Sequence, residues 1–117
     1  MLGLIQRVSN ASVSIDNQIN GKIDQGVLLL LGIQKEDHQG KADQLLKKVL
    51  NYRIFADDNG KMNLSANDIG GGLLVISQFT LAADTSKGLR PGFSTAAPPE
   101  QARALYNYFL AQATSLK

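Results

Sequence analysis

The sequence contains no cysteine, no tryptophan and only one histidine among its 117 residues. The absence of cysteine excludes disulfides, thiolate metal sites and a cysteine nucleophile. A single histidine excludes a histidine-rich metal site, and His38 is expected to be a solvated residue of a polar loop. It is also a poor basis for a Ser-His-Asp triad. An enzyme made from this chain would therefore depend on backbone N–H groups, hydroxyls and amides, or on a group carried by its substrate.

Long apolar runs and clustered charges are also lacking. No run approaches the length that spans a membrane, and the first residues turn polar too soon for a signal peptide. The carboxylates do not cluster, and Gly70 to Gly72 precede a strand, whereas phosphate-binding loops open a helix. The net charge of +2 permits a polyanionic partner without requiring one. We expect a soluble, cytoplasmic protein.

The pattern of apolar residues predicts a single α+β domain over residues 1–117. It indicates about six strands in an antiparallel or mixed sheet, with two amphipathic helices packed on one side. A turn is expected from Asn17 to Gly21, and the second helix should open near Pro99. The helical stripes comprise Ala42, Leu45, Leu46, Val49 and Leu50, then Ala102, Leu105, Phe109, Ala113 and Leu116. The expected strands include Leu2–Val8, Ala11–Asp16, Val27–Ile33, Tyr52–Ala56, Lys61–Ser65 and Leu73–Leu81.

Two of these strands, Val27–Ile33 and Leu73–Ile76, are apolar on both faces. Such strands are normally covered on both sides, and two helices are too few to cover both. A second copy of the protein could supply the missing cover, so we expect a homodimer.

The stretch from Leu73 to Leu81 is predicted to be the central strand, and it changes from apolar to polar at Ser77. Unpaired buried polar groups cost roughly 1–3 kcal/mol. Ser77, Gln78 and Thr80 therefore either bond to a neighbouring strand or present donors and acceptors to a ligand. The residues alone leave both interpretations open.

A series of short motifs along the chain resembles the D-aminoacyl-tRNA deacylases (the D-tyrosyl-tRNA deacylase family). The series runs in order and in register from the N-terminus to the last predicted helix, and this order makes it more specific than any single motif. It comprises Leu4-Ile5-Gln6-Arg7-Val8, Ala11-Ser12-Val13, Arg53-Ile54-Phe55, Gly60-Lys61-Met62-Asn63-Leu64-Ser65, Ser77-Gln78-Phe79-Thr80-Leu81, Ala83-Asp84-Thr85, Lys87-Gly88, Arg90-Pro91, Phe93-Ser94 and Ala96-Ala97-Pro98.

The resemblance implies a homodimer, active at its interface, that hydrolyses the ester joining a D-amino acid, or glycine mischarged on tRNA-Ala, to tRNA. It implies no metal or other cofactor. Main-chain N–H groups near Phe79 and Thr80 would bind the ester carbonyl, and the 2′-hydroxyl of the terminal ribose would assist the reaction. The catalytic segment would be Ser77, Gln78, Phe79 and Thr80, and the substrate-binding residues Arg7, Met62, Lys87, Arg90, Phe93 and Ala96.

Several roles stay open. Thr80 either attacks the ester or shapes the site through its backbone, and a Thr without a nearby base is a poor nucleophile. Gln78 either bonds to a neighbouring strand or contacts the substrate, and Met62 belongs either to the core or to the pocket. Lys87 and Arg90 are candidates for tRNA phosphates, and their loss should weaken binding and flatten its salt dependence. The exposed lysines Lys41, Lys47 and Lys48 are candidates too, or simply a solvated surface.

One departure concerns chiral selectivity. The family inserts a Gly-Pro dipeptide with a cis peptide bond into the partner's pocket, where Arg7 would help to orient it, but this sequence contains no Gly-Pro. We expect either that the 117 residues belong to a longer protein or that the chain lacks this selectivity. The alternative functions are a non-catalytic nucleic-acid-binding module, a pure interaction domain, and an editing domain like those of some threonyl-tRNA synthetases.

Overall fold

The computed structural model describes residues 1–78, 81, 92 and 96–115. The chain forms two compact units, each treated by itself below. The first unit comprises residues 1–4, 30–46 and 77–117, and the second comprises residues 5–29 and 47–76. The prediction of a single domain stays a prediction.

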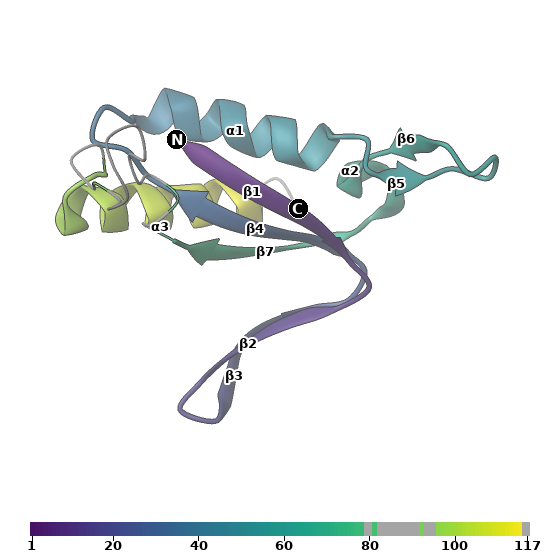
Figure 1. Cartoon of the computed structure of the whole chain (residues 1–117), viewed down its shortest axis with the longest axis horizontal. Helices are drawn as coiled ribbons and strands as arrows, with labels where there is room; N and C mark the ends of the chain where they lie inside the picture. Colours follow the sequence, from purple (N-terminus) through teal and green to yellow (C-terminus); the bar gives the residue numbers. More distant parts are fainter. Residues whose placement is uncertain (79–80, 82–91, 93–95, 116–117) are drawn as a thin grey trace. The chain divides into compact units, whose positions relative to one another are not determined.

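Seven strands and three helices are found in the described part of the chain (Figure 1). The strands are β1 Leu2–Val8, β2 Ala11–Ile15, β3 Gln18–Ile23, β4 Gly26–Gly32, β5 Phe55–Ala56, β6 Met62–Leu64 and β7 Gly72–Ser77. The helices are α1 Gln39–Asn51, α2 Ala66–Ile69 and α3 Pro99–Ser115.

The largest sheet has the strand order β1-β4-β7, with β4 in the middle. The N–H of Gly72 donates to the carbonyl of Gln25 (3.0 Å), and that of Gln78 to Leu31 (2.8 Å), at the same sequence separation. This constant offset makes β4 and β7 parallel, as their arrows in Figure 1 show, and a parallel pair needs a long crossover. We expected an antiparallel or mixed sheet, and the parallel pair of β4 and β7 excludes a purely antiparallel one. Our placing of Leu73–Leu81 at the centre of the sheet is wrong for the described strands, because β7 has only β4 as a neighbour among them.

Burial agrees with the central place of β4. Val27, Leu29 and Leu31 are fully buried, whereas Leu30 between them is half-buried. In β7 only Val75 is buried. Adding a Cβ at Gly26 would make it collide with the backbone of Gly72, so the beginning of β4 requires glycine for close approach of the two strands.

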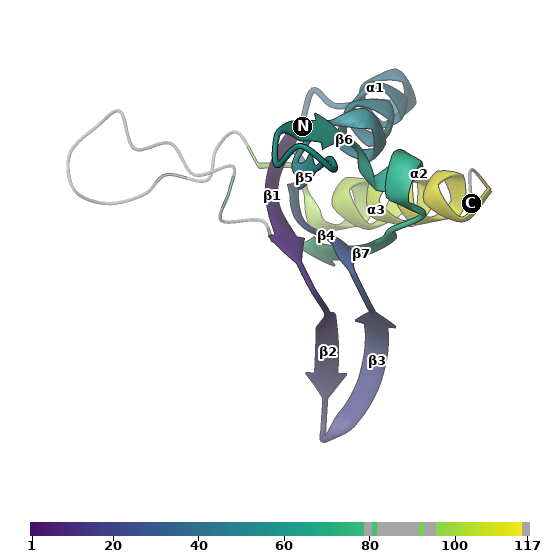
Figure 2. The same ribbon diagram turned by 90° about the vertical axis from the view of Figure 1, so that its right-hand side faces the viewer.

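The hairpin of β2 and β3 turns on two residues, Asp16 (φ 52°) and Asn17 (φ 65°) (Figure 2). Positive φ at both central positions is typical of the two-residue turns that suit the twist of a hairpin. Strand β3 therefore begins directly at Gln18. The turn predicted from Asn17 to Gly21 is wrong, because the chain has already reversed before Gln18.

The short helix α2 was not predicted. Ser65 accepts a hydrogen bond at its hydroxyl from the N–H of Asp68 (3.2 Å), and the Asp68 carboxylate accepts one from the N–H of Ser65 (2.8 Å). This reciprocal capping box begins the helix, and Gly70 ends it in a left-handed conformation (φ 64°). The spacing of Ser65, Asp68 and Gly70 was the signal that could have revealed it.

The two long helices bury part of the apolar stripes predicted for them, whereas Leu45, Ala102 and Ala113 are half-buried and Leu116 lies outside the described residues. In the first unit, Ala42 and Leu46 of α1 and Leu105 and Phe109 of α3 are buried. The Tyr108 hydroxyl of α3 donates to the Asp43 carboxylate of α1 (2.9 Å), which joins the two helices. The predicted α+β class is confirmed, and no helix in the described ranges is long and apolar enough to cross a membrane.

Candidate functional site

The structure places the predicted site residues in two groups. Ser77, Gln78 and Ala96 belong to the first unit, and Arg7 and Met62 to the second. The other five predicted residues lie outside the described residues; they are Phe79, Thr80, Lys87, Arg90 and Phe93.

In the first group, the end of β4 contacts Gln78, and the two residues after β4 contact Ala96 and Ala97. The Gln78 N–H donates to the carbonyl of Leu31 (2.8 Å), and the Ala97 N–H donates to that of Ile33 (2.9 Å). Gln34, just beyond β4, forms an antiparallel bridge with Ala96. Two stretches that are far apart in the sequence therefore meet along the last residues of one strand.

The same contacts restrict how the segment after β7 can serve as a hydrogen-bond donor. The backbone N–H of Gln78 is used by the sheet, so it cannot also bind an oxyanion. The side chains of Ser77 and Gln78 lie on an exposed part of the strand end. The donors that we expected near Phe79 and Thr80 thus stay predictions.

A tight turn follows β4 and is held by a buried carboxylate. The Gln34 N–H donates to Asp37 Oδ2 (2.7 Å), and the Asp37 N–H donates back to the Gln34 carbonyl (3.0 Å). The Asp37 side chain is only 1% exposed. The sequence predicts a polar loop around His38, and nothing in it indicates that Asp37 is buried.

Asp37 also has cationic partners. The part-buried Met1 α-ammonium lies 2.6 Å from Asp37 Oδ1. It donates to the side-chain carbonyl of Gln34 as well (3.1 Å), and Lys41 Nζ lies 3.9 Å from Asp37 Oδ1. Burial of a charge is costly unless it is paired, and here the carboxylate is paired on one oxygen and hydrogen-bonded on the other.

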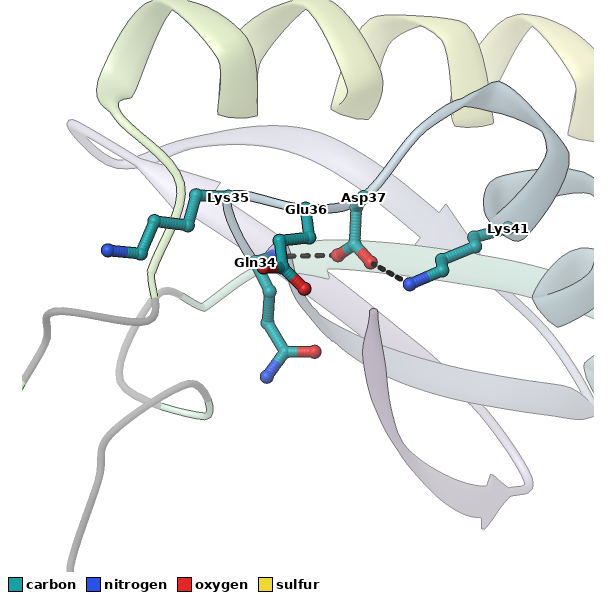
Figure 3. Close-up of a pocket in the computed structure, with 5 residues that line it drawn as sticks. All are labelled: Gln34, Lys35, Glu36, Asp37 and Lys41. Atoms are coloured by element: carbon teal, nitrogen blue, oxygen red, sulfur yellow. Dashed lines mark hydrogen bonds and ion pairs between the residues drawn. The ribbon is translucent and has the colours of Figure 1, made fainter.

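A small hollow of about 180 Å³ opens over this turn (Figure 3). Figure 3 shows the Asp37 carboxylate between the Gln34 backbone and the Lys41 ammonium, while Lys35 points away from them. Both signs of charge line the hollow, which suits a polar group better than an apolar one. Its lining residues are Gln34, Lys35, Glu36, Asp37 and Lys41.

In the second group, Arg7 donates from Nη1 to the carbonyl of Ile54 (2.9 Å), just before β5. Met62 begins β6 and is 66% exposed. This exposure excludes the core interpretation of Met62, while its role in a pocket stays a prediction. Arg7 is likewise a backbone anchor here, and its predicted contact with substrate stays a prediction.

The remaining titratable residues offer little further chemistry. His38 is exposed, and its Nδ1 accepts a hydrogen bond from the Gly40 N–H (3.1 Å) at the beginning of α1. In the ranges that the structure describes, no three His, Cys, Asp or Glu residues are grouped so that they could hold a metal ion.

Comparison with known sequences gives a consistent result. The family model described as D-Tyr-tRNA(Tyr) deacylase matches residues 4–117. The D-aminoacyl-tRNA deacylase of Pseudoalteromonas translucida is 62% identical over 116 residues, which cover 99% of this chain and 80% of that protein. The D-aminoacyl-tRNA deacylase of Cellvibrio japonicus is 62% identical over 98% of this chain and 79% of its own.

Comparison with solved structures agrees on the fold. A structure described as "c-Myc DNA Unwinding Element Binding Protein" has a TM-score of 0.91 and 39% identity, over 97% of this chain and 76% of that one. A probable eukaryotic D-amino acid tRNA deacylase has a TM-score of 0.80 at 14% identity, over 95% and 65% of the two chains. The second likeness concerns the fold alone. With a family model that matches nearly all of its residues and curated relatives of 62% identity, this chain belongs to the D-Tyr-tRNA(Tyr) deacylase family.

Proposed function

We propose that this chain hydrolyses the ester bond of D-aminoacyl-tRNA and releases free tRNA and the D-amino acid. The observation that carries the proposal is the 62% identity to D-aminoacyl-tRNA deacylases over nearly the whole chain. Identity of this extent includes both stretches that meet at the end of β4. Such an activity would remove D-amino acids from tRNA before they reach protein synthesis.

The proposed chemistry uses the segment Ser77 to Thr80. Because the Gln78 N–H bonds to Leu31, the proposed oxyanion donors are the N–H groups of Phe79 and Thr80. Each such donor typically lowers the barrier by ~2.7–4 kcal/mol. The 2′-hydroxyl of the terminal ribose would assist the attack on the ester carbonyl, since the described residues contain no obvious acid–base pair. Arg7, Met62, Lys87, Arg90, Phe93 and Ala96 remain the proposed substrate-binding residues.

The direct test is an ester-hydrolysis assay on D-tyrosyl-tRNA, with L-tyrosyl-tRNA and glycyl-tRNA-Ala as parallel substrates. We expect release of the D-amino acid far above the spontaneous rate. Release from the L-substrate measures whether this chain retains chiral selectivity. Binding of tRNA without any hydrolysis would contradict the proposal and favour a nucleic-acid-binding module, the function that the name of one structural relative suggests.

A matched pair of variants at Thr80 separates the roles of its backbone and its side chain. Thr80→Ala keeps the N–H, so we expect it to fold and keep most deacylation. Thr80→Pro removes the N–H, and loss of one oxyanion donor typically lowers kcat by about 10²–10³-fold. A thousandfold loss in Thr80→Ala, with an intact fold, would instead make the hydroxyl the nucleophile.

We also propose that the chain is a homodimer. In the first unit, Leu2 and Leu4 are 39% and 56% exposed, and alternate residues of a strand share a face. They lie on β1, an edge strand of the described sheet, and exposed apolar edges are sites of association. Leu30 of β4 is also only half-buried. A second copy would cover this face.

Sedimentation velocity tests this second proposal. The wild-type chain should sediment at twice the mass of one chain, and Leu4→Lys should shift it toward the mass of one. Asn107→Lys, at an exposed position of α3, adds the same charge elsewhere and should leave the mass unchanged. A wild-type protein that sediments as a single chain at micromolar concentration would contradict the proposal.

A further inference from the structure

We propose that Asp37 is a positioning residue for deacylation. It holds the turn after β4. Gln34 of this turn pairs with Ala96, and Leu31, three residues before Gln34, binds the N–H of Gln78. The proposal rests on the proposed function, because it assigns Asp37 a part in the same reaction. Asp37 itself makes no contact with the ester in this scheme.

A continuous set of backbone contacts connects the carboxylate to the site. Asp37 Oδ2 accepts from the Gln34 N–H at 2.7 Å, and the Gln34 carbonyl accepts from the Asp37 N–H at 3.0 Å. These two bonds fix the conformation of Gln34, which pairs with Ala96. One and three residues earlier, the carbonyls of Ile33 and Leu31 accept from Ala97 and Gln78.

The turn is also held from the opposite side. Gln101 of α3 donates from Nε2 to the carbonyl of Lys35 (2.8 Å) and to that of Asp37 (3.4 Å). Because α3 begins at Pro99, this bond lies only a few residues beyond the Ala96 bridge. The stretch from Ala96 to Gln101 is therefore joined to residues 33–37 at several successive points.

The negative charge of Asp37 strengthens the hydrogen bond that holds the turn. Hydrogen bonds to an ionised acceptor are shorter and about twice as strong as neutral ones, and this acceptor is nearly inaccessible to water. The Met1 ammonium lies 2.6 Å from Asp37 Oδ1 and orients the carboxylate. An amide at this position would have the same shape but would present an N–H₂ group to the ammonium or to the Gln34 N–H.

Loss of this support should act mainly on turnover. A misplacement of about 1 Å by a change far from the chemistry can cost about 100-fold in rate. A residue that orients the site without contacting tRNA should affect kcat and leave KM nearly unchanged, because phosphate contacts supply most of the binding. This split separates a positioning residue from a binding residue.

The test compares Asp37→Asn with the wild-type protein by steady-state kinetics and by amide hydrogen exchange. We expect kcat to fall by about tenfold to a hundredfold, with KM within about threefold. The amides of Gln78 and Ala97 should exchange about tenfold faster, because the carbonyls that bind them are less firmly placed. Gln101→Ala removes only the bonds from α3 and should give a smaller change in the same direction.

Asp68→Asn is the matched control. The Asp68 carboxylate also accepts a hydrogen bond from the N–H three residues earlier, that of Ser65, but it lies in the second unit. The substitution should lower stability without changing kcat or the exchange of the Gln78 and Ala97 amides.

Three results would overturn the proposal. The first is a wild-type kcat in folded Asp37→Asn. If that variant does not fold, a wild-type kcat in Gln101→Ala has the same meaning. The second is a loss of kcat without faster exchange at Gln78 and Ala97, and the third is an equal loss of kcat in Asp68→Asn. If the wild-type chain does not hydrolyse D-aminoacyl-tRNA, the proposed function fails, whereas the exchange measurement still decides whether Asp37 fixes the two residues.

Discussion

Two turns in this chain use the same local device with different surroundings. In residues 34–37 and in residues 65–68, an aspartate accepts the N–H of the residue three positions earlier, at 2.7 Å and 2.8 Å. The Asp37 side chain is 1% exposed and is paired with an ammonium, whereas Asp68 is exposed and begins a short helix. The hydrogen bond is the same, so burial and charge determine how much each turn contributes.

The difference shows why local geometry alone does not rank residues by importance. An exposed carboxylate that loses its partner is solvated by water, so the net loss is small. A part-buried cation that loses its carboxylate is solvated less completely, so the net loss is larger. The same local hydrogen bond therefore caps a helix at Asp68, whereas at Asp37 it stabilises a turn around a buried, paired carboxylate.

The largest expected effect comes from removing the buried carboxylate. Asp37→Ala leaves the part-buried Met1 ammonium without its carboxylate partner, and breaking a buried pair typically costs about 3–5 kcal/mol of folding free energy. Urea unfolding at pH 7 measures the loss. A loss below that of Asp68→Ala under the same conditions would contradict the comparison.

A smaller effect is expected at the beginning of α2. Ser65→Ala removes the hydroxyl that accepts the Asp68 N–H, and loss of an N-cap of this kind costs about 0.5–2 kcal/mol. The urea midpoint should fall while kcat for D-aminoacyl-tRNA stays at the wild-type value. A fall in kcat at unchanged stability would mean that α2 acts on the site, which the comparison excludes.

The smallest effect concerns pH. The Ser65 backbone N–H, aided by the Ser65 hydroxyl, holds the pKa of the Asp68 carboxyl below its ordinary value. A carboxyl with a lowered folded-state pKa stabilises the protein above its unfolded pKa of about 3.9 and ceases to do so as the pH falls through the folded value. The difference in urea midpoint between wild type and Asp68→Asn should therefore be full at pH 6 and shrink below about pH 4. A difference that grows on acidification would contradict this assignment.

Much of the fold could be predicted because local patterns determine it. The alternation of β2, the apolar run of β4 and the helical stripes of α1 and α3 depend on neighbouring residues alone. Helix α2 was missed although Ser65, Asp68 and Gly70 carried its signal, because a helix of four residues has no apolar stripe to reveal it. The site segment Ser77 to Thr80 was found through family resemblance, since its polar residues alone fitted two interpretations.

The features that sequence reasoning missed depend on distant partners. Asp37 is buried because its cation is Met1, 36 positions away in the chain, and no local pattern shows this. Among the described strands, β7 lies at an edge because it pairs only with β4, and an apolar run cannot specify such a pairing. Met62 was left between core and pocket because burial is set by the units as a whole.

The parallel pairing of β4 and β7 also has a consequence for the order of folding. The β2–β3 hairpin joins residues close in sequence and can form within microseconds. The bond from Gln78 to Leu31 spans a crossover that includes α1, β5, β6 and α2, and distant contacts of this kind form slowly. We therefore expect the candidate site to form late in folding, so that deacylase activity should return only when the chain has refolded completely.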